Sequence, residues 1–105
     1  MMTEQEAWME LAIKWSNARP NRLGNYATID NYGKLDDDGL CCSIDSLWYL
    51  CKIDVDTRRN MLDKISKQER EEDNNRSYCA YKWPLTKEGS EKRVLFCLKQ
   101  YNALK

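Results

Sequence analysis

The stretch TEQEAWMELAIKWS, residues 3–16, decides the fold class expected of this chain. Thr3 and Glu6 have the spacing of a capping box, in which each side chain satisfies a backbone N–H at the start of a helix. Apolar side chains then recur at the spacing of one helix face, at Trp8, Leu11, Ala12 and Trp15. The sequence therefore predicts an amphipathic helix, which ends before Arg19-Pro20 because proline disfavours helical geometry in the residue before it.

Three further segments carry apolar residues at helical spacing, over 39–52, 55–70 and 87–103. Their apolar positions include Leu40, Ile44, Leu47 and Trp48 in the first, Met61, Leu62 and Ile65 in the second, and Val94, Cys97, Leu98 and Tyr101 in the third. Asp54 and Thr86 stand where helix caps are expected. Four such segments predict an all-α fold, a compact bundle of four helices forming a single domain over residues 1–105.

The long connection over 17–38 is the least regular part of the chain. It is rich in asparagine, glycine, aspartate and proline, which are turn-forming residues. Loops of this length are uncommon within small domains and are often functional. A loose or partly stranded connection is the competing interpretation, and a brief strand within 26–30 fits the same residues.

The charge balance argues against several classes of protein. The chain has 105 residues with 17 basic and 17 acidic side chains, so its formal net charge is zero. Direct binding of nucleic acid is not expected, because nucleic-acid-binding domains are usually basic. No apolar run approaches the roughly 18 residues that a membrane-spanning helix needs. The start, Met1-Met2-Thr3-Glu4, lacks the basic and then apolar pattern of a signal peptide, which predicts a cytoplasmic protein.

The residue types needed for catalysis and metal binding are scarce. The chain contains no histidine, which is the commonest general base and metal ligand. Its five cysteines have no C-x-x-C spacing and are expected to be buried, reduced thiols. The run Asp36-Asp37-Asp38-Gly39 is similar to a calcium loop, but Lys34 would occupy the first ligand position. We therefore expect no enzyme, no metal and no cofactor.

Two sets of residues are candidates for binding. The first combines two acidic clusters with two aromatic residues, and such clusters can steer a protein onto a basic partner surface. It consists of Tyr32, Asp36, Asp37, Asp38, Glu69, Glu71, Glu72, Asp73 and Trp83. The second is an arginine set for a phosphate or nucleotide, since arginine suits phosphates and aromatic rings suit bases. It consists of Arg19, Arg22, Arg58 and Arg59. The competing interpretation is that these arginines are ordinary solvated cations without a ligand.

Two motifs resemble a loose group of small bacteriophage proteins of unassigned function. The first is Gly39-Leu40-Cys41 at a helix start, and the second is the tail WPLTxEG, residues 83–89, followed by Arg93-x-x-Phe96-Cys97. The resemblance covers the chain from about Gly39 onward. These are mostly capping and core positions, so the resemblance implies a fold and an origin more than an activity.

A phage origin implies a function only by analogy. Small phage proteins without catalytic residues often bind host proteins, and inhibitors of CRISPR and other defence systems are prominent examples. We therefore expect a non-enzymatic, anti-CRISPR-like protein that inhibits a host protein in the bacterial cytoplasm, as a monomer or small homo-oligomer. The alternative is a protein that sequesters a nucleotide or another small molecule with the arginine set.

Overall fold

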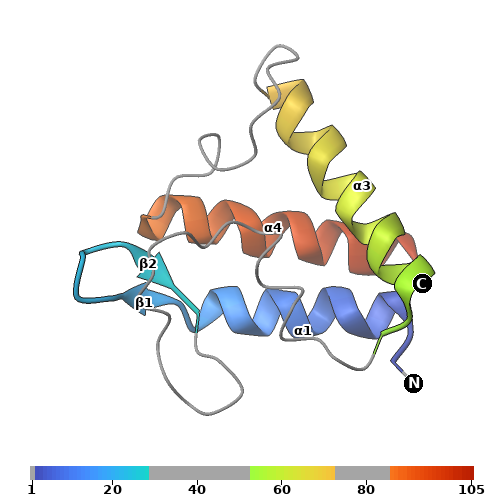
Figure 1. Ribbon diagram of the computed structural model, residues 1–105, viewed down its shortest axis with the longest axis horizontal. Coiled ribbons are helices and arrows are strands. Elements are labelled where there is room, and N and C mark those ends of the chain that lie inside the picture. The colour runs from blue at the N-terminus through green and yellow to red at the C-terminus, as the bar shows by residue number, and fades with distance from the viewer. Residues whose placement is uncertain (1, 29–52, 73–85) are drawn as a thin grey trace.

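The computed structural model describes residues 2–28, 53–72 and 86–105 (Figure 1). Within these ranges the chain is mostly helical, and its elements are α1 (Glu4–Ser16), β1 (Arg19–Pro20), β2 (Tyr26–Ala27), α3 (Val55–Glu72) and α4 (Lys87–Ala103). The helices predicted over 3–16, 55–70 and 87–103 are confirmed to within two residues at each end. The helix predicted over 39–52 lies outside the described residues, so the bundle of four helices stays a prediction.

The predicted capping residues start all three described helices. The Thr3 hydroxyl accepts the Glu6 N–H at 3.2 Å, and the Glu6 carboxylate accepts the Thr3 N–H at 3.0 Å, which completes the capping box. Asp54 accepts the Thr57 N–H at 2.6 Å at the start of α3. The Thr86 hydroxyl accepts the Gly89 N–H at 3.1 Å at the start of α4. Local side-chain chemistry thus fixes where each helix begins.

A small hairpin follows α1. Strands β1 and β2 are antiparallel, with Arg19 opposite Ala27 and Pro20 opposite Tyr26. The Asn21 side chain accepts two backbone N–H groups of the turn, and Gly24 supplies the left-handed backbone that the turn needs, with φ of 83°. Strand β2 lies within 26–30, where a brief strand was one of two interpretations, whereas its pairing with residues 19–20 was not predicted.

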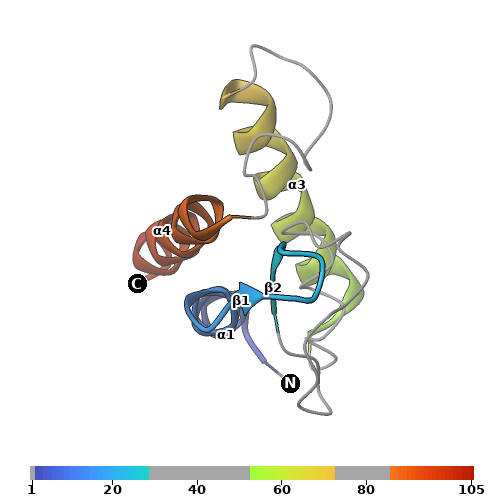
Figure 2. The same cartoon turned by 90° about the vertical axis from the view of Figure 1, so that its left-hand side faces the viewer.

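The helices are arranged in a layer of two with a third on one side. Helices α1 and α4 run antiparallel, so both chain termini lie at the same end and the hairpin lies at the other (Figure 1). Figure 2 views these two helices nearly end-on and shows α3 to one side of them. None of the described helices combines the length with the apolar character needed to cross a membrane.

The core forms where the three helices meet. The predicted face of α1 is buried, and it packs against Phe96 and Cys97 of α4 and against Met61 and Ile65 of α3. The rings of Trp8 and Phe96 meet edge to face, with centroids 5.6 Å apart. A smaller cluster around Trp15 and Ala27 continues toward the hairpin.

Candidate functional site

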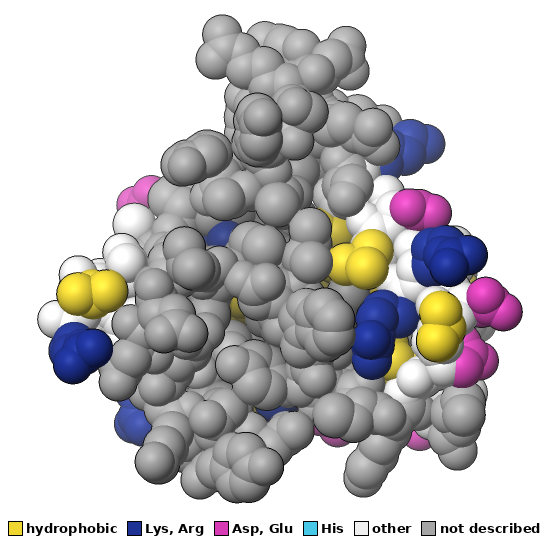
Figure 3. Space-filling view, in the orientation of Figure 1, with side chains coloured by type: hydrophobic (Ala, Val, Ile, Leu, Met, Phe, Trp, Pro, Cys, Tyr) yellow, Lys and Arg dark blue, Asp and Glu magenta, His cyan; other side chains and the backbone are white. Residues whose placement is uncertain are grey.

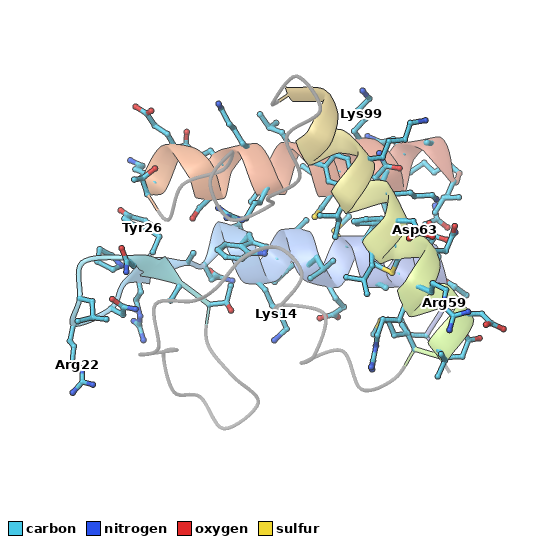
Figure 4. The ribbon with its side chains drawn as sticks, turned by 45° about the horizontal axis from the view of Figure 1, so that its top comes forward. Lys14, Arg22, Tyr26, Arg59, Asp63 and Lys99 are labelled. Atoms are coloured by element: carbon cyan, nitrogen blue, oxygen red, sulfur yellow. The ribbon has the colours of Figure 1, made fainter. Side chains whose placement is uncertain are left out.

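A pocket of about 520 Å³ lies where the end of α1, strand β2 and the first half of α4 meet. Figure 4 shows Tyr26 at this end, between the hairpin and α4. The lining is mainly apolar and consists of Trp15, Ser16, Ala18, Tyr26, Lys87, Ser90, Glu91, Val94 and Leu95. Sites for small ligands typically measure about 300–1,000 Å³ and have such a lining with a few polar groups.

The indole of Trp15, which borders this pocket, is held by a buried arginine. Arg93 of α4 is fully buried, and its guanidinium carbon lies 4.5 Å from the centroid of the Trp15 ring. A cation over an aromatic face is worth most when both groups are removed from water, as they are here. Arg93 therefore fixes the position of this wall of the pocket.

Two polar atoms of pocket residues lack a hydrogen-bond partner. The indole N–H of Trp15 and the hydroxyl of Ser90 are both buried, and neither bonds to any residue that the structure describes. Ser90 as a whole is 4% exposed. A buried unsatisfied polar group costs about 1–3 kcal/mol, and such groups are rare enough to need an explanation. Their presence beside one pocket favours a binding role for it.

The rim of the pocket is solvated and carries both signs of charge. Lys87 and Glu91 are exposed, and they lie one helical turn apart at the start of α4. Leu95 is 67% exposed although it is apolar and borders the pocket. The site thus has an apolar interior, two unsatisfied polar atoms and a rim that combines an exposed leucine with balanced charges.

The Glu4 carboxylate, at the opposite end of α1, is satisfied by the protein itself. Glu4 accepts hydrogen bonds from the Trp8 indole at 2.9 Å, from the Asn60 amide at 2.6 Å and from the Lys64 ammonium, with which it also forms an ion pair. Partial burial disfavours ionisation of Glu4, but the hydrogen bonds from Lys64, Trp8 and Asn60 outweigh it and lower its pKa. This cluster joins α1 to α3 and needs no ligand.

Mixed charges also surround this end of the molecule. On the face shown in Figure 3, basic, acidic and hydrophobic side chains alternate near the start of α3. No single sign of charge dominates the described part of that face, as the zero net charge leads one to expect.

Cys97 is the cysteine that the structure describes, and it is a buried core residue. Burial raises the pKa of its thiol to about 12, although the nearby Arg93 opposes the shift. A thiol with this pKa is protonated at neutral pH and is therefore a poor nucleophile or metal ligand. The prediction of a structural cysteine is confirmed at this position, while Cys41, Cys42, Cys51 and Cys79 lie outside the described residues. The described ranges contain no cluster of three potential metal ligands.

The predicted arginine set is not brought together. Arg19 and Arg22 are exposed on the hairpin, whereas Arg58 and Arg59 lie in the first turns of α3. Figure 4 shows Arg22 and Arg59 at opposite ends of the molecule. A single phosphate or nucleotide cannot contact both pairs.

The predicted acidic and aromatic set falls largely outside the described residues. Glu69, Glu71 and Glu72 belong to the last two turns of α3. Tyr32, Asp36, Asp37, Asp38, Asp73 and Trp83 lie in the segments that the structure does not describe. This partner surface therefore stays a prediction.

The pocket itself was not predicted, although the sequence contains a signal for it. Two of the buried residues of α4 are polar, Ser90 and Arg93, and they lie beside the buried Phe96 and Cys97. Polar residues on an otherwise apolar helical stripe indicate a special environment at that position. Spacing alone did not reveal which other segments would meet them.

Comparison with known proteins adds no assignment. No protein-family model matches the chain, and the searches of curated proteins and of solved structures give no significant match.

Proposed function

We propose that this protein is a non-enzymatic binding protein that inhibits a host protein, with a component of bacterial antiviral defence as the expected target. The resemblance to small phage proteins supports the origin. The observation that carries a binding role is the apolar pocket at the hairpin end, with exposed Leu95 on its rim. Exposed apolar side chains beside an apolar hollow are typical of interaction sites.

The first experiment tests the host-protein interaction and its position. Tagged protein is used to recover partners from bacterial lysates, in parallel with the variants Leu95→Asp and Val55→Asp. These residues have nearly equal exposure, 67% and 68%, but Val55 lies at the start of α3, away from the pocket. We expect the unaltered protein and Val55→Asp to retain one stoichiometric partner that Leu95→Asp loses. Recovery of no stoichiometric partner from several hosts would contradict the proposal.

A second candidate function is the sequestering of a small molecule. The volume of the pocket favours it, because about 520 Å³ falls within the range of small-ligand sites. The site would be this pocket rather than the four arginines, which lie in two separate places. A thermal-shift screen with nucleotides and cyclic dinucleotides distinguishes a phosphate site at the arginines from an apolar site in the pocket. A ligand that binds only the folded state raises the melting temperature of the protein. We expect no shift with these phosphates.

A further inference from the structure

The strongest unexplained feature of the described residues is the pair of unsatisfied atoms beside the pocket. Trp15 is 2% exposed and Ser90 is 4% exposed, so neither polar atom is compensated by water at the surface. The neighbouring Ser16 is a useful contrast, since its hydroxyl donates to the Ile13 carbonyl at 2.7 Å. Of the two serines that line this pocket, Ser90 is thus the one with an unused donor.

The charges around the pocket indicate what kind of ligand would use that capacity. The buried lining residues, Trp15 and Ser90, are uncharged, while Lys87 and Glu91 are exposed and oppose each other in sign. An ionised group inside the pocket would lose its hydration without gaining a lining residue of opposite charge at that depth, since Arg93, which stacks on the Trp15 ring, is not among the lining residues. The start of α4 also presents the partly positive end of a helix, which favours an acceptor oxygen.

The two side chains differ in how freely their polar groups can turn. Arg93 stacks on the Trp15 ring and holds it in place. Ser90 lines the pocket, and its hydroxyl turns about the single χ1 bond, whose staggered positions point it in different directions. Ser90 is therefore the residue from which we expect a ligand contact, and the Trp15 N–H beside it should report on occupancy.

We infer that this pocket binds a small uncharged molecule with an aromatic or aliphatic body and one carbonyl-type acceptor, to which the Ser90 hydroxyl donates a hydrogen bond. The inference rests on the second candidate function, in which the pocket is a ligand site. Ser90 selects the ligand in this site, and the four arginines take no part in it.

The test is an NMR titration of the full chain with three matched probes. Acetophenone has a carbonyl acceptor, ethylbenzene has the same carbon skeleton without the oxygen, and benzoate carries a charge. We expect acetophenone to bind about 5-fold more tightly than ethylbenzene, the ratio that one ordinary hydrogen bond supplies. Benzoate is expected to bind more weakly than acetophenone. The Trp15 indole signal should move on binding, while that of Trp8, which is already bonded to Glu4, should stay in place.

Two serine variants make the test specific. Ser90→Ala is expected to bind acetophenone more weakly than ethylbenzene, because the carbonyl then loses its hydration without gaining a donor, and to bind ethylbenzene as the unaltered protein does. Ser16→Ala is the matched control, because Ser16 also lines the pocket but already uses its hydroxyl. It should keep the preference of about 5-fold for acetophenone.

The outcomes separate this inference from the functions on which it depends. Equal binding of acetophenone and ethylbenzene, a preference that survives Ser90→Ala, or benzoate binding as tightly as acetophenone would overturn the inference and leave the pocket as a ligand site. Absence of saturable binding by all three probes would overturn the inference and the sequestering function together. The host-protein proposal is decided by the recovery experiment alone.

Discussion

Trp8 and Trp15 occupy the same face of α1, seven residues apart, yet they have opposite surroundings. The N–H of Trp8 donates to Glu4 and its ring meets Phe96 edge to face. The N–H of Trp15 has no partner among the described residues, and its ring lies under Arg93 beside a pocket. Both side chains are buried, so exposure does not distinguish them. What differs is whether the protein itself completes the hydrogen bonding.

This difference suggests different roles for the two ends of the molecule: stability for the end near Trp8 and binding for the end near Trp15. Folded proteins are stable by only about 5–15 kcal/mol, so unsatisfied buried groups are expensive to keep. Departures from full satisfaction tend to concentrate where function requires them. The proposed binding role therefore belongs to the hairpin end, while the contacts of Glu4 at the end with the termini join α1 to α3.

The largest effect is expected at Arg93. Arg93→Ala removes a fully buried side chain and its stacking on Trp15, so we expect the free energy of unfolding to fall by about 2–4 kcal/mol. Chemical denaturation followed by circular dichroism measures the change. Lys92→Ala is the control, because Lys92 is next to Arg93 in the sequence but its side chain is exposed. This substitution should change the free energy of unfolding by less than about 0.5 kcal/mol. Similar effects of the two variants would show that the stacked pair is not a structural element.

The next effect concerns the satisfied end. Glu4→Gln removes the charge that faces Lys64 and weakens the hydrogen bonds from Trp8 and Asn60, so a loss of about 1–3 kcal/mol in the free energy of unfolding is expected. Glu10→Gln on the same helix is the control, since no hydrogen bond or ion pair of Glu10 is seen within the described ranges. A Glu4 variant as stable as the Glu10 variant would contradict the proposed role of the cluster.

The same carboxylate gives a pH dependence of defined sign. The pKa of Glu4 is lowered in the folded protein from its ordinary value of 4.5. Its stabilising contribution is therefore fully present above pH 4.5 and is lost as the pH falls through the lower folded pKa. Hydrogen bonds from Thr3 and Thr57 also lower the pKa values of the capping residues Glu6 and Asp54, which adds to the same trend. Acid unfolding should be less steep in Glu4→Gln than in the unaltered protein.

A direct comparison of the two tryptophans follows. Trp8→Phe loses a hydrogen bond and core volume, so a loss of about 1–3 kcal/mol in the free energy of unfolding is expected. Trp15→Phe removes an N–H that has no described partner, and its loss should be smaller by about 1 kcal/mol. Urea denaturation of both variants measures the difference. If Trp15→Phe destabilised the protein at least as much, the contrast between the two ends would be wrong.

Local patterns predicted the helices well because their signals lie within a few residues. Thr3 with Glu6, Asp54 and Thr86 are capping residues whose partners lie three positions away, and the stripe from Trp8 to Trp15 is a single helix face. The pairing of Arg19 with Ala27 depends on a turn that only the folded backbone shows.

The pocket was not predictable for a related reason. Trp15 and Ser90 are 75 positions apart in the sequence, and nothing in either local pattern shows that they border one space. The separation of the arginine set has the converse reason, because Arg22 and Arg59 share a chemistry but not a location. Residue type identifies what a side chain can bind, and tertiary packing decides which side chains meet.

The smallest effect is expected at the first turn of α4, where two hydroxyls have different surroundings. The Thr86 hydroxyl caps the helix by accepting the Gly89 N–H, so Thr86→Ala should lower the free energy of unfolding by about 1 kcal/mol. The Ser90 hydroxyl is buried without a described partner, so Ser90→Ala removes a desolvated group and should leave stability unchanged or raise it slightly, by up to about 1 kcal/mol. Thermal unfolding of the two variants side by side measures this. A loss in Ser90→Ala as large as that in Thr86→Ala would mean that the folded protein already satisfies the Ser90 hydroxyl, and the pocket would then lose its hydrogen-bond donor for a ligand.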